Sequence, residues 1–451
     1  MAKPTDVVRI GVGAGFADDR IEPAIDLVER ADLDFLVFEC LAERTTARES
    51  LTRRHDPEKG YNPRLIERME RILPLCLDKR VRIVTNMGAA NPGGGARAVR
   101  KMAEEQGLGD VPVAVVEGDD IESIIRTMPE LPVMETGEPV ESLLPNMVAA
   151  HAYLGADVVC RGLETGAPLV ITGRVSDPSL FLAPAMHYWK WAPDDLPRLA
   201  AGTIAGHLLE CSGQLTGGCF ADPGMKDVPD LAHLGNPYAD ITLDGQVEVG
   251  KCPDTGGRLD RATATEQLLY EMHDPAAYIT PDCVLDVTDV ELHESGPDRV
   301  RVTGAAARPH TDTYKVSVGY HDGFIGEGQV SYAGINAVAR AKLAAEIIQQ
   351  RLRENPYNYT EMRVDLIGMS SLHGREPDGP EPYEVRLRVA ARCDSRAAAG
   401  QVGFETRAMH VNGPSGGGGG IDPIIREILA VQSVLLPRQL VKPRIYVEGA
   451  A

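Results

Sequence analysis

Aromatic residues are scarce in this sequence, at 5% of the chain, and only two of them are tryptophan. Positively charged residues are also few. The chain has 46 Lys and Arg but 66 Asp and Glu, which gives a formal net charge of −20. Such a surplus of negative charge argues against binding to nucleic acid or to an anionic membrane surface. We therefore expect a small molecule as the partner, and neither nucleic acid nor a membrane.

The cysteines and the hydrophobic runs exclude two further classes of protein. The eight cysteines are scattered and form no CxxC pair, which is typical of reduced thiols rather than of a disulfide framework. No run approaches the ~18 apolar residues of a membrane span, and the first ten residues, MAKPTDVVRI, contain no apolar leader. We expect a cytoplasmic protein.

Several motifs that would indicate a metal, cofactor or nucleophile are missing. The 11 histidines show no HExxH and no clustered ligand spacing, so no metal site is predicted, although distant Asp and His residues could still assemble one. Gly11–Gly15 reads GxGxG, not the GxGxxG of a dinucleotide site, and Asn86–Gly95 lacks the Gly-Lys-Ser/Thr ending of a P-loop. No serine lies in a GxSxG elbow at Ser176 or Ser212. We expect no required cofactor.

What is present is an alternation of short apolar runs, polar loops and helical segments. The expected strands are residues 7–12, 33–38, 81–85, 113–116 and 169–171, and the expected helices include residues 21–30, 63–78, with a kink or early end at Pro74, and 146–163. This alternation predicts parallel strands joined by crossovers, so that every loop after a strand emerges at the same edge of the sheet. The loops that should meet there are Gly13–Phe16, Glu39–Arg44, Asn86–Gly95, Glu117–Asp120 and Thr172–Asp177.

The second half of the chain differs in character. From about residue 214 short strands dominate, including 315–320 and 323–328, around a helix at 264–273 with Thr263 as N-cap and Glu266 closing a capping box. The last ~90 residues read as a small α+β unit with helices at 394–401 and 423–431 and a final strand at 444–447. We predict an α/β fold with a largely parallel sheet and flanking helices, and two domains, 1–358 and 359–451.

The densest chemical run is LVITGRVSD, residues 169–177, in which a buried strand ends in a polar turn before Pro178. Its Arg174 is expected to hold a carboxylate or phosphate. Asp177 or Asp222 is expected as general acid or base, and Asn86 with the backbone amides near Gly88 and Gly173 as the group that stabilises an oxyanion. The alternative is a well-capped loop with Arg174 in a structural ion pair.

Further residues are predicted to line the ligand site. Glycine-rich turns can expose backbone N–H groups to an anion, although the Asn86–Gly95 loop and the Gly416–Gly420 run could equally be flexible segments. Lys226 could bind phosphate, act as a base or form a surface ion pair. The predicted ligand-binding residues are Gly13, Gly15, Gly88, Thr172, Gly173, Ser176 and Lys226.

Long runs of this sequence resemble the acyclic terpene utilisation AtuA family. The runs that carry the resemblance, over roughly residues 8–355, are IGVGAGFADDR (10–20), DLDFLVFECLAERT (32–45), TNMGAANPGG (85–94), ITGRVSDPSL (171–180), GGCFADPGMKDVPDL (217–231), PDTGGRLDRATATEQLLYEMHDPAAYITPD (253–282) and YAGINAVARAKLA (332–344). The resemblance implies a ferredoxin-like C-terminal domain. Some members carry a Ser-Gly-Asp-Lys-Gly motif there, and this sequence has Asn412–Gly420 in its place.

The resemblance also implies a role in the catabolism of branched acids, often as coenzyme A thioesters, beside acyl-CoA carboxylases and hydratases. We therefore expect a catabolic enzyme that acts on a small branched carboxylate or its coenzyme A thioester by hydration, lyase or hydrolytic chemistry. The alternative is a non-catalytic binding or scaffolding subunit of an acyl-CoA-processing complex, with an acyl-CoA carboxylase as the kind of partner. On general grounds we expect a homo-oligomer.

Overall fold

The computed structural model describes residues 6–375 and 379–449. Residues 1–5, which belong to the N-terminal stretch without an apolar leader, lie outside the described part. The chain divides into two compact units, residues 1–319 with 431–451, and residues 320–430. The second unit thus begins before residue 358, where the sequence placed the boundary.

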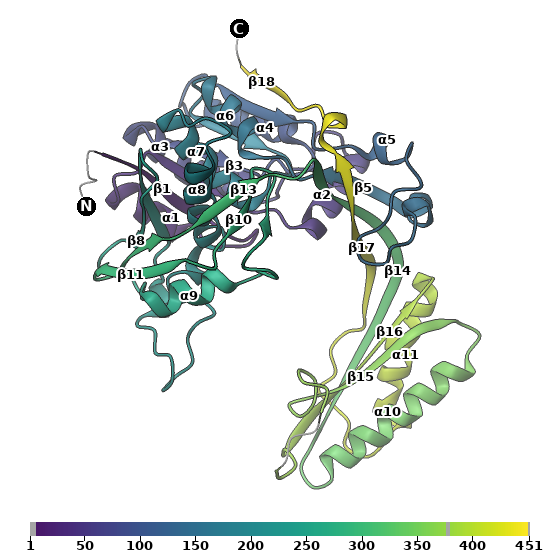
Figure 1. The fold of residues 1–451 in the computed structure, drawn as a ribbon. Helices are drawn as coiled ribbons and strands as arrows, with labels where there is room; N and C mark the ends of the chain where they lie inside the picture. Colours follow the sequence, from purple (N-terminus) through teal and green to yellow (C-terminus); the bar gives the residue numbers. More distant parts are fainter. Residues whose placement is uncertain (1–5, 376–378, 450–451) are drawn as a thin grey trace. The chain divides into compact units, whose positions relative to one another are not determined.

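The first unit is built on a ten-stranded mixed sheet in the order β11-β12-β8-β7-β1-β2-β3-β6-β4-β18 (Figure 1). Strands β1, β2, β3, β6 and β4 pair in parallel, and the other neighbours pair antiparallel. The strands are β1 (Val7–Ala14), β2 (Phe35–Phe38), β3 (Arg82–Thr85), β4 (Val113–Glu117), β6 (Leu169–Thr172), β7 (Pro237–Thr242), β8 (Val247–Lys251), β11 (Glu291–Gly296), β12 (Arg299–Thr303) and β18 (Arg444–Glu448).

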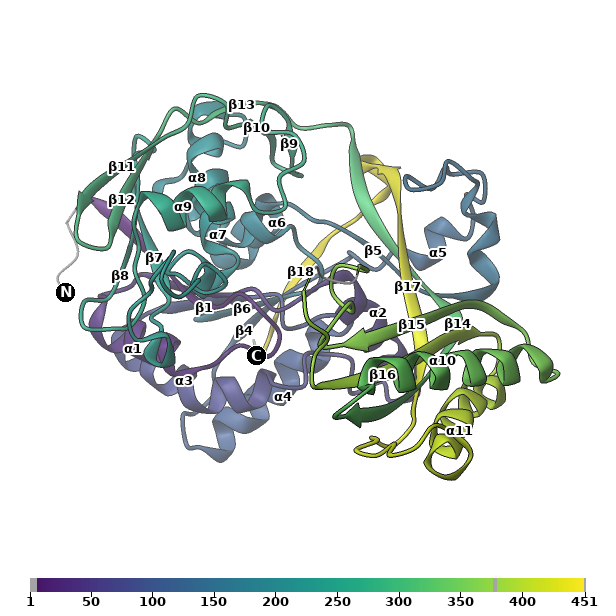
Figure 2. The same cartoon turned by 90° about the horizontal axis from the view of Figure 1, so that it is seen from below.

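Helices cover both faces of this sheet, as Figure 2 shows on either side of β1 and β4. The helices are α1 (Glu22–Arg30), α2 (Glu43–His55), α3 (Leu65–Lys79), α4 (Pro92–Glu105), α5 (Glu122–Ile125), α6 (Ala156–Glu164), α7 (Asp177–Trp189), α8 (Leu196–Leu209) and α9 (Arg261–Leu269). Helices α1, α3 and α4 form one layer, and α6, α7 and α8 form the other. The further strands are β5 (Met147–Ala152), β9 (Tyr278–Ile279), β10 (Cys283–Asp286), β13 (Ala306–Pro309) and β14 (Thr313–Ala333).

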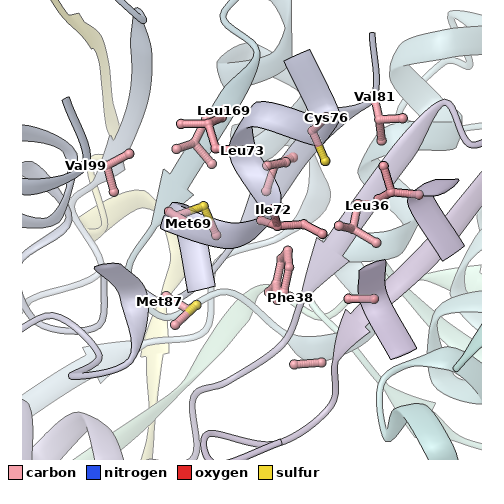
Figure 3. Close-up of a cluster of buried hydrophobic side chains, with 14 of the residues drawn as sticks. Leu36, Phe38, Met69, Ile72, Leu73, Cys76, Val81, Met87, Val99 and Leu169 are labelled. Carbon is pink, nitrogen blue, oxygen red and sulfur yellow. The ribbon is translucent and has the colours of Figure 1, made fainter. Parts of the chain in front are cut away.

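A hydrophobic core lies between the sheet and the layer of α1, α3 and α4 (Figure 3). Apolar residues at three- and four-residue spacing on α3 face strand residues that alternate along β2 and β3. The side chains labelled in Figure 3 are Leu36, Phe38, Met69, Ile72, Leu73, Cys76, Val81, Met87, Val99 and Leu169. This packing fixes the strand ends, and with them the loops that follow.

The second unit has the element order β14, α10 (Ala337–Glu354), β15 (Tyr359–Ile367), β16 (Glu384–Cys393), α11 (Arg396–Asn412) and β17 (Ile424–Pro437). Its sheet has the order β15-β16-β14-β17. Val330, Leu387 and Val389 of the sheet pack with Ala341 and Ile348 of α10.

The predicted helix 423–431 and the first part of the predicted helix 146–163 are strands, while the rest of the latter forms α6 (Ala156–Glu164). Residues 147–152 form β5, which pairs with β14, and residues 424–437 form β17, which also pairs with β14. The apolar residues of both segments fit the helical period as well as the strand period, so the sequence favoured helices. Pairing with β14 makes both segments strands. Strand β14 itself is continuous, where the sequence predicted two strands.

Three further local expectations differ from the structure. Helix α3 does not end at Pro74, and the Glu70 carbonyl that loses its helical donor accepts a hydrogen bond from Gln106 Nε2 at 3.3 Å. The N-cap of α9 is Asp260, and Thr263 is its capping-box partner. The last strand, β18, pairs with β4 in the sheet of the first unit, not in the C-terminal domain.

Candidate functional site

The carboxyl ends of the parallel strands bring the predicted loops together. In the pairing register Ala14 lies beside Phe38, Phe38 beside Thr85, Thr85 beside Ile171, and Thr172 beside Val116. The loop after β2 is joined to the loop after β3, because Cys40 N donates to Asn86 Oδ1 at 2.8 Å. The loop after β6 is joined to the loop after β4, because Arg174 N donates to Asp119 Oδ2 at 2.8 Å. The predicted convergence at one edge is confirmed.

Arg174 is the buried cation of this edge, with 1% of its surface exposed. Its guanidinium donates to the Leu41 carbonyl and to Asp177 Oδ1, and it lies 4.4 Å from the centre of the Tyr153 ring. Burial alone would lower the pKa of Arg174, but the charge of Asp177 and other nearby acidic groups raise it. The site therefore holds a permanent positive charge.

Glu39 is a buried carboxyl on the loop after β2. Its Oε1 accepts hydrogen bonds from Leu41 N at 2.9 Å and from Asn86 Nδ2 at 2.8 Å. Burial, and then the charge of Asp177, raise the pKa of Glu39 to about 8, while the Arg174 cation opposes that rise. At neutral pH the Glu39 carboxyl therefore retains a proton.

Asp177 is the partner carboxyl, at the first residue of α7 and beside Arg174. Burial and the negative charge of Glu43 raise the pKa of Asp177, and the Arg174 cation lowers it. The net effect is a raised pKa. About a third of its side chain is exposed, whereas Glu39 is 8% exposed. Glu39 and Asp177 thus form a pair of interacting carboxyls beside one guanidinium, with one member open to solvent.

Glu43, by contrast, is an ionised carboxylate. Burial alone would raise its pKa, but the hydrogen bond from Tyr153 Oη at 2.5 Å and the helical backbone of α2 lower it to about 2. The negative charge of Glu43 helps to hold Tyr153 over Arg174. Lys315 Nζ lies 3.4 Å from the same Glu43 oxygen.

A second proton-holding group lies at the end of α8. Glu210 Oε1 is 3.1 Å from His207 Nδ1, and His207 Nε2 is 3.0 Å from the Leu268 carbonyl. Burial raises the pKa of Glu210 to about 7, against the effect of His207, and Asp177 adds to the rise. Glu210 Oε2, Ser212 Oγ and Gln267 Oε1 are buried and have no hydrogen-bond partner among the described residues.

Gly15 allows β1 to approach this segment, because a Cβ at Gly15 would lie 2.5 Å from the Glu210 carbonyl oxygen.

Comparison with protein families matches residues 8–447 to the acyclic terpene utilisation family protein AtuA. The chain belongs to the AtuA family. The match extends beyond the residues 8–355 on which the resemblance was based, so it includes the second unit. No curated protein and no solved structure matches the chain.

In this AtuA-family chain most of the predicted site residues come together. The strand-end residues Gly13, Gly15, Asn86, Gly88, Thr172, Gly173, Arg174, Ser176 and Asp177 all lie at or beside the carboxyl edge of the parallel strands. The backbone at Gly88 lies so close to the loop after β6 that a Cβ at this position would be 2.5 Å from the Thr172 carbonyl oxygen, so glycine is required. Ser176 occupies the N-cap position of α7, but its side chain makes no capping hydrogen bond.

Asp222 and Lys226 are placed differently. They pair with each other through the backbone, with Asp222 N donating to Lys226 O at 3.0 Å. The Lys226 ammonium forms an ion pair with Glu266 and lies 4.7 Å from the centre of the Phe220 ring. Within residues 6–375 and 379–449, neither side chain forms a hydrogen bond or ion pair with Arg174, Asp177 or Glu39.

The sequence placed the loop Glu39–Arg44 at this edge but did not select several of the residues that form the site. Glu39 directly follows a predicted strand, so the rule that selected Asn86 and Arg174 could have selected it. Glu43 lies on α2, which was not predicted because its small and polar buried residues give no apolar period. Tyr153 follows β5, which was predicted as a helix, and Glu210 carried no local signal.

No group of three or more His, Cys, Asp or Glu side chains in the described part of the chain is arranged to hold a metal ion. No described helix has the length and apolar character needed to cross a bilayer.

Proposed function

We propose that this AtuA-family chain is a cytoplasmic catabolic enzyme that acts on a small branched carboxylate or its coenzyme A thioester by hydration, lyase or hydrolytic chemistry. The observation that supports the proposal is the Glu39–Asp177 carboxyl pair beside the buried Arg174 guanidinium. Two carboxyls with raised pKa values next to one fixed cation are suited to giving and removing protons near neutral pH.

The environments of the two carboxyls suit them to different roles in proton transfer. Glu39, with a pKa of about 8, is the proton donor, and the more exposed Asp177 is the base that meets the substrate. Hydratases and lyases share one requirement. One group removes a proton from the carbon beside a carbonyl, and another donates a proton to the oxygen that leaves or becomes protonated. A hydrolytic reaction would use the same pair to activate water.

Arg174 and Asn86 act as positioning residues in this proposal. The guanidinium is bonded to the Leu41 carbonyl and to Asp177, so it orients Asp177, and its buried Nε has no partner among the residues described. Asn86 accepts from Cys40 N and donates one Nδ2 hydrogen to Glu39, so it orients Glu39, and its second Nδ2 hydrogen can serve the predicted oxyanion role.

We also infer two properties of the whole chain. The second unit is ferredoxin-like, which is supported by its β14-α10-β15-β16-α11-β17 order and its strand order β15-β16-β14-β17. The enzyme forms a homo-oligomer, on the general prevalence of symmetric assemblies.

The test is turnover by the purified chain alone. A panel of branched acyl-CoA thioesters and the matching free acids is incubated with the wild-type protein and with Glu39→Gln, and products are followed by mass spectrometry. Glu39→Gln keeps the size of the side chain but has no acidic proton, so we expect kcat to fall by roughly 10²–10⁴-fold. Glu104→Gln, an exposed change on α4, is the matched control and should retain wild-type kcat.

Two results would overturn the proposal. Equal turnover by wild type and Glu39→Gln would remove Glu39 from the chemistry. Turnover that appears only when a second protein co-purifies would favour the non-catalytic subunit instead.

A further inference from the structure

A second constellation of catalytic residue types lies on α2 and β5, outside the Glu39–Asp177 pair. Ser50 Oγ is 3.1 Å from His151 Nε2, and His151 Nδ1 is 2.8 Å from Asp119 Oδ2. The three residues come from α2, β5 and the loop after β4, and α2 packs directly against β5. All three are buried, at 8%, 2% and 3% exposure for Ser50, His151 and Asp119.

Asp119 is held in place on its far side. The backbone N of Arg174 donates to Asp119 Oδ2 at 2.8 Å, and a Cβ at residue 173 would collide with the carboxylate, so Gly173 allows the close approach. A fixed carboxylate that accepts from His151 Nδ1–H leaves Nε2 free to accept the Ser50 hydroxyl proton. Burial alone would lower the pKa of His151, but the hydrogen bond and charge of Asp119 raise it, so the ring can hold a proton.

Ser50 Oγ has a second neighbour, the Thr46 carbonyl at 2.9 Å. This bond is compatible with a nucleophile, because the hydroxyl can donate to either acceptor. With neutral His151 the hydroxyl donates to Nε2, and with protonated His151 the ring donates to Oγ while the hydroxyl donates to Thr46.

The constellation opens into a cavity of about 260 Å³. Ser50 and His151 line the cavity together with Arg53, Arg54, Asp120 and Glu122. Arg54 pairs with Glu122 at 2.5 Å, and Arg53 donates to the Ala90 carbonyl at 2.6 Å and lies 3.9 Å from Asp120. The charged lining suits a small polar acyl group rather than a long hydrocarbon chain.

We propose that Ser50, His151 and Asp119 form a nucleophilic site that hydrolyses an ester or thioester of a small polar acyl group. Ser50 Oγ bonds to the acyl carbon while its proton passes to His151 Nε2. The bond from that carbon to the leaving oxygen or sulfur breaks, and His151 returns the proton to the leaving group. Water then cleaves the acyl–Ser50 ester, which releases the acid and restores the hydroxyl.

This activity is separate from the proposed acid–base site. Ser50 follows Glu43 by seven residues on α2, about two turns or ~10 Å along the helix. Glu43 belongs to the Arg174 cluster, and Ser50 lines the cavity. The two proposals therefore stand or fall on different side chains.

Covalent labelling tests the nucleophile without any turnover of coenzyme A thioesters. The full chain is treated with an alkyl fluorophosphonate, and we expect one phosphonyl adduct per chain by intact mass and Ser50 as the modified residue by peptide mass spectrometry. Para-nitrophenyl acetate should give a stoichiometric burst of nitrophenol with an acetylated Ser50. Ser50→Ala should lose both signals, and His151→Gln should slow labelling at least 100-fold.

Ser142→Ala, at an exposed serine, is the control and should be labelled as fast as wild type. The site of modification in the wild-type chain decides the question even where a variant does not fold. No adduct on the wild type, or an adduct elsewhere than Ser50, would overturn the proposal. Either result would leave the proposed acid–base function untouched.

Discussion

At the scale of the residue, burial shifts the titration of several carboxyl groups upward. It raises the pKa of Glu39 to about 8, of Glu210 to about 7 and of Asp282 to about 6. The hydrogen bonds that these groups form lower their pKa values and so offset only part of the effect of burial. Carboxyl groups with raised pKa values lower the free energy of unfolding at high pH. Their titration can therefore be tested without knowing the substrate.

The free energy of unfolding should fall as pH rises through the range in which Glu39 titrates. Below its ordinary pKa of 4.5, Glu39 is protonated in both states, and between 4.5 and about 8 only the folded state keeps the proton. Stability is thus fully present at low pH and is lost at up to ~1.4 kcal/mol per pH unit from this one group. Glu39→Gln has no proton to lose, so its free energy of unfolding should decline less steeply between pH 5 and 8. Urea denaturation at one-unit intervals measures both slopes, and equal slopes would refute the raised pKa.

The residues of the site were predictable where they directly follow a strand. Arg174, Asp177 and Asn86 were found because parallel strands end at one edge, and the position of Glu39 obeys the same rule. The positioning role of Asn86 was not predictable, because it depends on two hydrogen bonds to the neighbouring loop. Ser50 and His151 lie 101 residues apart in sequence, and no spacing rule connects them.

At the scale of the element, prediction succeeded for segments whose period and flanking residues agree. Strands β1, β3, β4 and β6 and helices α1 and α3 lie close to their predicted bounds. Prediction failed for β5 and β17, because both are defined by pairing with β14 and not by their own pattern. It also failed for α2, whose buried face is made of Thr46, Ala47, Glu49 and Ser50.

The start of α4 depends on Asn91, which does two jobs. Its Oδ1 caps the helix by accepting from Gly94 N at 3.0 Å, and its Nδ2 donates to the carbonyls of Pro57 at 2.8 Å and Lys59 at 2.7 Å. Asn91→Ala should lower the free energy of unfolding by ~2–3 kcal/mol, since it removes the cap and leaves two carbonyls without their donor. Asn91→Ser keeps a capping oxygen and should lose about 1 kcal/mol less. Chemical denaturation of the three proteins checks the order, and equal losses for Ser and Ala would show that the cap contributes nothing.

At the scale of the whole molecule, the chain returns to its first sheet at the end. After the second unit, β18 adds antiparallel to β4, with Arg444 opposite Glu117 and Glu448 opposite Val113. Tyr446 Oη also donates to Glu117 Oε1 at 3.0 Å. The parallel part of the sheet, from which the site emerges, is therefore bordered at β4 by an antiparallel strand from a distant part of the sequence.

Removing residues 442–451 should therefore destabilise the first unit. Strand β4 would become an unpaired edge, and the loss of five paired residues costs ~3 kcal/mol or more in the free energy of unfolding. An exposed edge strand rich in valine also promotes association, so light scattering should rise as the melting temperature falls. Arg444→Ala removes an exposed ion pair with Glu117 and a surface contact with the Tyr446 ring, and should stay within about 0.5 kcal/mol of wild type. If the truncated chain melts with the wild type, β18 is dispensable, and the parallel strands that precede Glu39 and Arg174 are held by their helices and by the remaining strands of the sheet.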